Sequence, residues 1–442
     1  MKTKIDFLNG STGKSLFKMV MPLFMATVLM LAYTLVDSIW VGNLLGEAGY
    51  AALTTSGAVA LILYALTSGL GTGTSILVSQ LIGKNDRKKT DEMIGTAIAS
   101  SLVFSLVVII VLECFLNRIL ITFNTPQEIY NDAKDYLAIF LLGFSAIFIY
   151  MQLTSIFRSF GDPMFQMKGM LFGTLINAVA DPLFIKAFGI SGAAISTVVS
   201  NLLCLLLAII YGMKKSYFVL TFKGVNLKNI SLFLKTVIPA SIQNCIPAIS
   251  SMIMVILVNR FDVTTIAAYG VVKNVENILF YPAMAMSMAL ITIIGQLYGA
   301  KRFDRIKDYM NAAIKSGIAV ELVLTGLVLL FAKNISLAFV KERAVAEIVS
   351  HGLKIIGIGY ICYMMTSIFS AKLSGAGKVK LSMILMFAYY ILIRVPLASL
   401  LIRTSLLLDG MWIAILVSHL AATLIAYIIS SKSYSESELS LI

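Results

Sequence analysis

The sequence predicts an all-α integral membrane protein in which twelve transmembrane helices form two six-helix lobes related by a pseudo-two-fold axis. Of its 442 residues, 59% are hydrophobic and 13% are charged, whereas soluble domains contain about 25% charged residues. Its mean hydropathy is +0.92. Apolar stretches of about 20 residues, the length that crosses a bilayer, follow one another so closely that no room remains for a domain outside the membrane. The second half of the chain also repeats motifs of the first, which predicts the two lobes.

Each apolar stretch predicts one transmembrane helix. The twelve predicted ranges are 15–40, 51–82, 91–116, 134–157, 164–188, 190–213, 231–258, 264–298, 305–332, 346–371, 379–402 and 408–431. The first apolar block, from about Leu16 to Val41, is too long for the h-region of a signal peptide and has no small-residue cleavage site. It is therefore expected to be the first span.

The basic residues indicate which loops face the cytoplasm. They gather in alternate loops, as Lys2, Lys4, Lys14, Lys84, Arg87, Lys88, Lys89, Lys214, Lys215, Lys223, Lys228, Lys301, Arg302, Arg305 and Lys307. The opposite loops are short and nearly neutral, as in GNLLGEAGY (42–50), or carry balanced charge, as in KERAVAE (341–347). The positive-inside rule then predicts a multi-pass protein of the plasma (inner) membrane with both termini in the cytoplasm. The net charge of +13 therefore reflects how a chain in a lipid bilayer is oriented. No nucleic-acid partner is expected.

An internal repeat relates the two halves. LFKMVMP (16–22) matches FLKTVIP (233–239) at an offset of 217 in the numbering. Three further pairs match at an offset of 216, namely Gln80 with Gln296, Gly83 with Gly299, and Gly161 with Gly377. Because each half has an even number of predicted helices, both halves share one orientation, and the pseudo-two-fold axis runs along the membrane normal. The predicted domains are an N-terminal lobe at 1–213, a cytoplasmic linker at 214–230 and a C-terminal lobe at 231–442.

The fifth predicted span carries polar residues inside an apolar run, GMLFGTLINAVADPLFIKAF (169–188). Asn177 and Asp181 are four residues apart, so on a helix they share one face and can point at one small ion or proton. Pro182 follows and is expected to loosen the helix beside the carboxylate. An ionisable group at membrane depth costs roughly 2.5 to 3.5 kcal/mol, so it usually marks a transport pathway. The alternative is that Asp181 caps a broken helix or pairs with a neighbouring donor.

Asp37 is the second intramembrane acid of the first half. It follows Lys18 on the first span by about 28 Å at the rise of an α-helix, at an outer depth comparable to that of Asp181. The two acids make a plausible ion or proton site, which Asn177 and the hydroxyls of Ser196, Thr197 or Ser200 would complete, with Tyr33 one turn before Asp37 as the favoured aromatic residue. The alternative is that Asp37 is an interfacial aspartate wetted by lipid headgroups.

The second half does not repeat these acids. At the offset of 217, Asp37 meets Met254. Around Asp181 the match is ILIRVP (391–396), which places Arg394 where the first half has its acid.

Other charged residues lie within predicted spans of the second half. Lys273 and Glu276 are three residues apart and can pair on one helix face, while Glu321 would balance Arg394. Mutual neutralisation and a role in substrate binding both remain open for these residues. Structural roles are favoured for Glu113 and His419.

The sequence supports neither a metal centre nor an enzyme. The four cysteines are scattered singly, and the two histidines have no partner motif. The chain has no GxSxG elbow and no P-loop. No cofactor is expected, and the only ion considered is Na⁺ at Asp37, Asn177 and Asp181.

These residues and the repeat together resemble the multidrug and toxic compound extrusion (MATE) family of the multidrug/oligosaccharidyl-lipid/polysaccharide flippase superfamily. The resemblance rests on MPLFMATVLMLAYTLVDSIWVGNLLG (21–46), IFRSFGDP (156–163), NAVADPLFI (177–185), SQLIGKND (79–86) and GQLYGAKR (295–302). It implies a monomeric antiporter that exports organic cations and drugs in exchange for H⁺ or Na⁺ by alternating access. It also implies that Asp37 and Asp181, with Asn177, form the cation site.

One departure from the family concerns a sodium site that some members form with acids on helices 7 and 10. The matching segments here, VIPASIQNCIPAI (237–249) and IIGIGYICYMMTSIF (355–369), contain no acid. A second-lobe sodium site of that kind is therefore not expected.

Two other transporter classes are alternatives. A flippase for lipid-linked saccharides would need a strongly cationic cavity, which Lys273 and Arg394 would begin but Asp37 and Asp181 oppose. A major facilitator transporter would carry a glycine- and arginine-rich signature in its second loop, which GKNDRKKTDE (83–92) does not supply.

Overall fold

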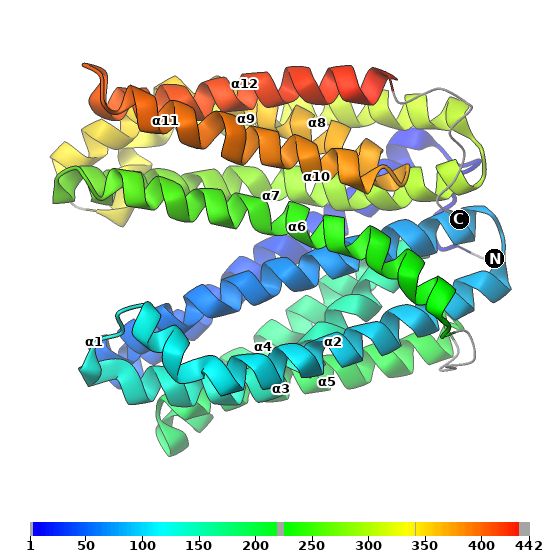
Figure 1. Ribbon diagram of the computed structural model, residues 1–442, viewed down its shortest axis with the longest axis horizontal. Coiled ribbons are helices and arrows are strands. Elements are labelled where there is room, and N and C mark those ends of the chain that lie inside the picture. The colour runs from blue at the N-terminus through cyan, green and yellow to red at the C-terminus, as the bar shows by residue number, and fades with distance from the viewer. Residues whose placement is uncertain (1–2, 219–224, 341, 433–442) are drawn as a thin grey trace. The chain divides into compact units, whose positions relative to one another are not determined.

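The computed structural model describes residues 3–218, 225–340 and 342–432, and within these ranges it contains helices and no β-strand (Figure 1). The elements are α1 (Thr12–Gly83), α2 (Arg87–Thr122), α3 (Gln127–Ser159), α4 (Met164–Phe188), α5 (Ile190–Lys214), α6 (Leu227–Val258), α7 (Val263–Gly299), α8 (Phe303–Phe339), α9 (Arg343–Gly375), α10 (Val379–Phe387), the π-helix η1 (Ala388–Arg394), α11 (Val395–Leu401) and α12 (Leu407–Lys432). In the described ranges, eleven helices are long and apolar enough to cross a membrane, with Val379–Leu401 counted as one. The predicted all-helical membrane class is confirmed.

Helix α1 is too long for a single span. Its 72 residues would extend about 108 Å, whereas the apolar core of a bilayer is about 30 Å thick. The backbone leaves the helical conformation at Gly46 (φ 69°, ψ −159°), which glycine adopts without a Cβ clash. The loop predicted at 42–50 is therefore wrong in extent, because helical residues continue on both sides of this glycine.

One other local prediction differs from the structure. The predicted helix at 379–402 is divided into α10, η1 and α11, and the π-helical turns widen the middle of this segment. Pro182 lies inside α4, which continues to Phe188, so the expected loosening beside Asp181 does not end the helix. The predicted linker at 214–230 includes residues 219–224, which lie outside the described residues and contain Lys223. Lys2 also lies outside them.

The chain divides into two compact units. Unit 1 comprises the described residues of Met1–Asp6 and Met21–Ser241, and unit 2 comprises those of Phe7–Val20 and Ile242–Ile442. In unit 1, α3 packs against α2 and α5, and α5 packs against α4. In unit 2, α9 packs against α7, α8 and α12. Each unit can therefore bury polar residues between its own helices.

A close approach of α4 to α5 positions the polar residues of unit 1. A Cβ atom at Gly192 would lie 2.0 Å from the carbonyl oxygen of Phe184. Since that atom belongs to the backbone, only glycine permits this approach. The approach sets α5 directly beside the face of α4 that bears Asn177 and Asp181.

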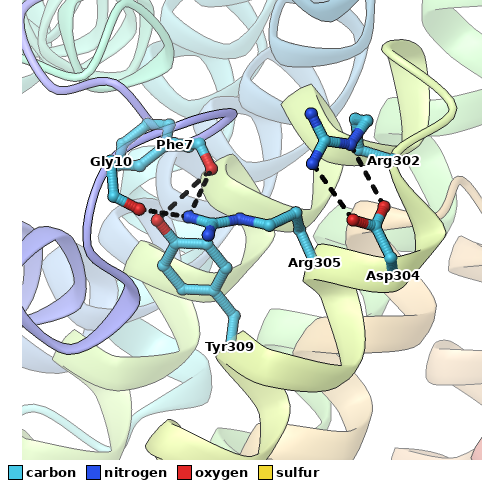
Figure 2. Close-up of polar contacts among 6 residues, drawn as sticks. All are labelled: Phe7, Gly10, Arg302, Asp304, Arg305 and Tyr309. Atoms are coloured by element: carbon cyan, nitrogen blue, oxygen red, sulfur yellow. Dashed lines mark hydrogen bonds and ion pairs between the residues drawn. The ribbon is translucent and has the colours of Figure 1, made fainter.

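In unit 2, the segment before α1 is held against α8, as Figure 2 shows. Phe7 is fully buried, and its ring lies edge-on to Tyr309 at 6.5 Å between centroids. Its carbonyl oxygen accepts hydrogen bonds from the Tyr309 hydroxyl and from Arg305 Nη2, both at 3.4 Å. Arg305 also donates to the carbonyl oxygen of Gly10. Arg305 lies in the first turn of α8, not in the predicted loop, and it holds the segment before α1 in place.

The repeat is visible in the backbone of the two units. Asn85 and Lys301, which correspond at the offset of 216, both have φ 58°, an uncommon value for residues other than glycine. Gly161 (φ 73°) and Gly377 (φ 85°) correspond at the same offset. Matching positions of the repeat thus carry matching left-handed residues at helix ends.

Candidate functional site

Unit 1 contains a buried polar cluster that begins on α4. Asn177 Nδ2 donates to Asp181 Oδ1 at 2.8 Å and to Ser196 Oγ of α5 at 3.2 Å. All three side chains are fully buried. Asn177 and Asp181 were predicted to share one helix face, and the hydrogen bond between them confirms that they do.

Helix α1 contributes the second acid of this cluster. Asp37 is 7% exposed, and its carboxyl group lies close enough to that of Asp181 for direct interaction. Tyr33, one turn earlier, lies beside Thr197 of α5. We call Tyr33, Asp37, Asn177, Asp181, Ser196 and Thr197 the acidic cluster.

Several oxygens of the acidic cluster lack a hydrogen-bond partner within the described part of the chain. They are Tyr33 Oη, Asp37 Oδ1, Asn177 Oδ1 and Asp181 Oδ2. A buried polar atom without a partner is costly. Four such oxygens around two acids make a place that a proton or a small cation would stabilise.

Two tyrosines at this cluster were not predicted. Tyr64 and Tyr136 both lie within electrostatic range of Asp37. Tyr136, on α3, is 6% exposed and stacks on Phe140 with 6.3 Å between centroids. No sequence signal distinguishes them, because aromatic residues are frequent throughout the spans.

Unit 2 contains a different cluster, centred on Arg394 at the end of η1. Arg394 Nε donates to Ser418 Oγ at 2.9 Å, and Nη2 donates to the Tyr389 hydroxyl at 2.9 Å. The i, i+5 spacing of Tyr389 and Arg394 suits a π-helix. The guanidinium also lies over the rings of Tyr389 and Tyr390, at 4.9 Å and 4.7 Å from their centroids, a favourable cation–π arrangement.

His419 of α12 joins this network. Its Nδ1 lies 2.6 Å from the Tyr389 hydroxyl, and its Nε2 lies 3.3 Å from Arg394 Nη2. Because a guanidinium can only donate, Nε2 accepts and the imidazole is neutral in this arrangement. We call Tyr389, Tyr390, Arg394, Ser418 and His419 the arginine cluster. Its tyrosines, Ser418 and His419 were not predicted as partners of Arg394.

The remaining charged candidates of unit 2 lie on α7 and α8. Lys273 Nζ and Glu276 Oε2 form the predicted pair at 3.8 Å. Glu276 also lies within electrostatic range of Arg394. Glu321 of α8 is fully buried, and both of its carboxyl oxygens lack a partner among the described residues.

The acidic cluster does not have the donor set of a multivalent metal site. Within the described residues, no group of three or more His, Cys, Asp or Glu side chains is placed to hold a metal ion. Two carboxyl groups with amide, hydroxyl and phenol oxygens instead suit a proton or a monovalent cation.

Comparison with known proteins identifies the family. The MatE family model matches residues 22–183 and again residues 239–400, which together make up well over half of the chain. The chain belongs to the MatE family. The two matches begin at the two prolines that end LFKMVMP and FLKTVIP, so the predicted repeat is confirmed.

Relatives of this MatE protein match over nearly the whole chain. It is 25% identical to the probable multidrug resistance protein YoeA of Bacillus subtilis over 430 residues, which cover 94% of this chain and 93% of YoeA. It is 23% identical to the multidrug export protein MepA of Staphylococcus aureus over 377 residues, covering 84% of this chain and 83% of MepA. The solved Vibrio cholerae MATE transporter VcmN matches with a TM-score of 0.92 at 20% identity, covering 97% of this chain and 98% of that chain.

The resemblance drawn from the sequence motifs is confirmed by these matches. The protein is a multi-pass membrane transporter of the MatE family and not an enzyme.

Proposed function

We propose that this MatE protein is a secondary active antiporter that exports amphiphilic organic cations, including drugs, in exchange for H⁺ or Na⁺ by alternating access. The observation that carries the proposal is the buried pair Asp37 and Asp181, whose carboxyl groups interact while one oxygen of each has no partner in the described residues. Relatives named for multidrug resistance and export support the substrate class.

The proposed topology has twelve spans. The break at Gly46 would divide α1 into two spans, which raises the eleven spanning helices to twelve. We propose the lobes at 1–213 and 231–442, joined by a cytoplasmic linker at 214–230, in a monomer of the plasma (inner) membrane with both termini in the cytoplasm. The alternating loop charges support this orientation.

In the proposed cycle, the carboxylates of Asp37 and Asp181 attract an organic cation from the cytoplasmic side. When the site opens outward, a proton or Na⁺ binds these carboxylates and removes the attraction, so the cation leaves. Asn177 and Thr197 position the acids and supply oxygens for the ion, and Tyr33 offers an aromatic face to the cation. Lys273, Glu276 and Arg394 are proposed to contact substrate in unit 2.

A second candidate is a flippase for a lipid-linked saccharide or another amphiphile. The arginine cluster favours it, because Arg394 makes no hydrogen bond to a carboxylate among the described residues and is suited to a phosphate group. The buried acids of unit 1 favour the antiporter.

The proposed function is tested with purified protein in proteoliposomes, by following ethidium uptake under a pH gradient or a sodium gradient imposed separately. We expect one gradient to drive uptake by the wild type, and we expect Asp181→Asn to lower it about a hundredfold. Tyr130→Phe, which removes the hydroxyl of a half-buried tyrosine that bonds to Asn117, serves as the control. If neither gradient moves ethidium for well-folded wild type, cation export is wrong, and lipid-linked substrates would be tested next.

A further inference from the structure

Glu321 is a buried acid that the proposed exchange does not use. It lies at the midpoint of α8, which runs from Phe303 to Phe339. Its side chain is fully buried. A carboxyl group at the middle of a transmembrane helix is costly and usually functional.

The surroundings of Glu321 contain further polar atoms without partners. Thr325 lies one turn later on the same face of α8, and Tyr360 lies on α9. They are 5% and 1% exposed. Within the described ranges, no hydrogen-bond partner is present for the hydroxyl of Thr325, the hydroxyl of Tyr360 or either carboxyl oxygen of Glu321.

The packing of α8 on α9 shows that these groups face one another. A Cβ atom at Gly317 of α8 would lie 2.9 Å from Met364 Cγ, and one at Gly357 of α9 would lie 3.1 Å from Leu329 Cδ1. On α8, Glu321 and Thr325 lie between Gly317 and Leu329. On α9, Tyr360 lies between Gly357 and Met364. Tyr360 is also within electrostatic range of Glu321.

Among the described residues, no basic side chain is positioned to balance a Glu321 carboxylate. The titratable groups that face it from α9 are Tyr360 and Tyr363. On α7, Lys273 is paired with Glu276, and the hydrogen bonds of Arg394 go to the arginine cluster. Within the described residues, no ion pair includes Glu321. An ionised carboxylate here would be uncompensated, so the site favours a bound proton.

We propose that Glu321, together with Thr325 and Tyr360, forms a second proton-binding site, in unit 2. The proposal rests on the proposed antiport function and adds one proton to its exchange. A proton binds the Glu321 carboxylate to give the neutral acid and leaves again as the cycle proceeds, with no other bond changed. Tyr360 is suited to hydrogen-bond either form of the carboxyl group, because its buried hydroxyl is otherwise without a partner in the described residues and both donates and accepts.

The test measures the ethidium concentration ratio at steady state in proteoliposomes, with the membrane potential held at zero and a fixed pH gradient imposed. Each proton exchanged per ethidium multiplies the attainable ratio by about ten per pH unit, since a tenfold ratio is about 1.4 kcal/mol. We expect Glu321→Gln to keep transport but lower the ratio about tenfold per pH unit. Glu321→Asp keeps the acid and should keep the ratio, as should Glu128→Gln at an exposed position. An unchanged ratio in Glu321→Gln would overturn the proposal.

A second readout does not depend on transport. Infrared difference spectra of the wild type between acidic and alkaline pH should contain a band of a protonated carboxylic acid that Glu321→Gln removes and Asp181→Asn retains. If the band is absent, or responds to Na⁺ instead of pH, Glu321 is not a proton site. Absence of ethidium transport under either gradient would remove the antiport proposal, while the infrared band would still report on Glu321 itself.

Discussion

The two halves of this protein match one family model yet hold opposite polar chemistry. At the offset that relates the two matches, Asp37 and Asp181 correspond to Met254 and Ala398, which are buried in one apolar core of unit 2. At this uniform offset Asn177 corresponds to Arg394, whereas the match based on ILIRVP sets Arg394 against Asp181. The repeat thus supplies a common helical frame, while the buried charged residues differ between the two halves.

What the halves share is backbone geometry. Gly192 in unit 1 approaches the backbone of Phe184, and Gly410 in unit 2 approaches the backbone of Leu401, with added Cβ atoms at 2.0 Å and 2.7 Å from main-chain atoms. Both glycines lie near the start of the last helix of their repeat. These contacts bring α5 and α12 against their neighbours whatever the charge of the nearby clusters.

The largest effect is expected where this shared frame is broken. Gly192→Ala and Gly410→Ala should each destabilise the protein by about 3 kcal/mol or more, because backbone atoms cannot move aside as side chains do. Thermal unfolding in detergent measures the effect. Gly270→Ala, which places its Cβ in open space, is the control. Unchanged midpoints for both variants would show that the close approaches do not define the frame.

The next largest effect is on transport, and it compares the acids of unit 1 with a residue at a corresponding position of unit 2. Asp37→Asn and Asp181→Asn should each lower gradient-driven ethidium transport about a hundredfold, or about 2.7 kcal/mol, because the neutral amide cannot exchange a charge. Met254→Leu, at the position that corresponds to Asp37, should keep transport within about twofold. Equal losses in Asp37→Asn and Met254→Leu would place coupling outside the acidic cluster.

Replacing the arginine of unit 2 should affect stability through its partners. Arg394→Met should cost about 2 kcal/mol, because Ser418, Tyr389 and His419 each lose a buried hydrogen-bond partner. Arg260→Met, at an exposed position, should change the unfolding midpoint little. A stability loss in Arg260→Met as large as that in Arg394→Met would mean that the arginine cluster does not stabilise unit 2.

The smallest effect concerns two matching helix starts. Asp86 caps α2 by accepting a hydrogen bond from the backbone N–H of Lys89 at 3.1 Å, whereas Arg302, its counterpart in the repeat, makes no side-chain cap at α8. Asp86→Ala should cost about 1 kcal/mol, and Arg302→Ala about half of that or less, since it loses only an exposed pair with Asp304. Unfolding midpoints of the two variants measure the difference, and the reverse order would contradict this assignment of the caps.

Local rules predicted much of this fold. Hydropathy located most of the helices within a few residues, and the repeat offset found in the sequence agrees with the family match. Helical spacing alone predicted the contact of Asn177 with Asp181 and that of Lys273 with Glu276. These contacts are short-range, so the periodicity of one helix is sufficient to find them.

Contacts between helices could not be predicted in this way. Nothing in the sequence indicated that Ser418 and His419 of α12 would bind Arg394, because that contact depends on the π-helical turns of η1 and on how α12 packs beside them. The expectation that Glu321 would balance Arg394 relied on charge alone, whereas the electrostatic partners of Glu321 are Tyr360 and Tyr363. Side-chain direction decided both cases.

The most direct measurement is the affinity of the purified wild type for ethidium as pH and Na⁺ concentration are varied, compared with that of Asp181→Asn. If cation and coupling ion compete for the acidic cluster, acidification or added Na⁺ should weaken ethidium binding by about tenfold or more. Asp181→Asn should bind weakly and lose this dependence. Wild-type affinity that stays constant across both series would contradict exchange at Asp37 and Asp181.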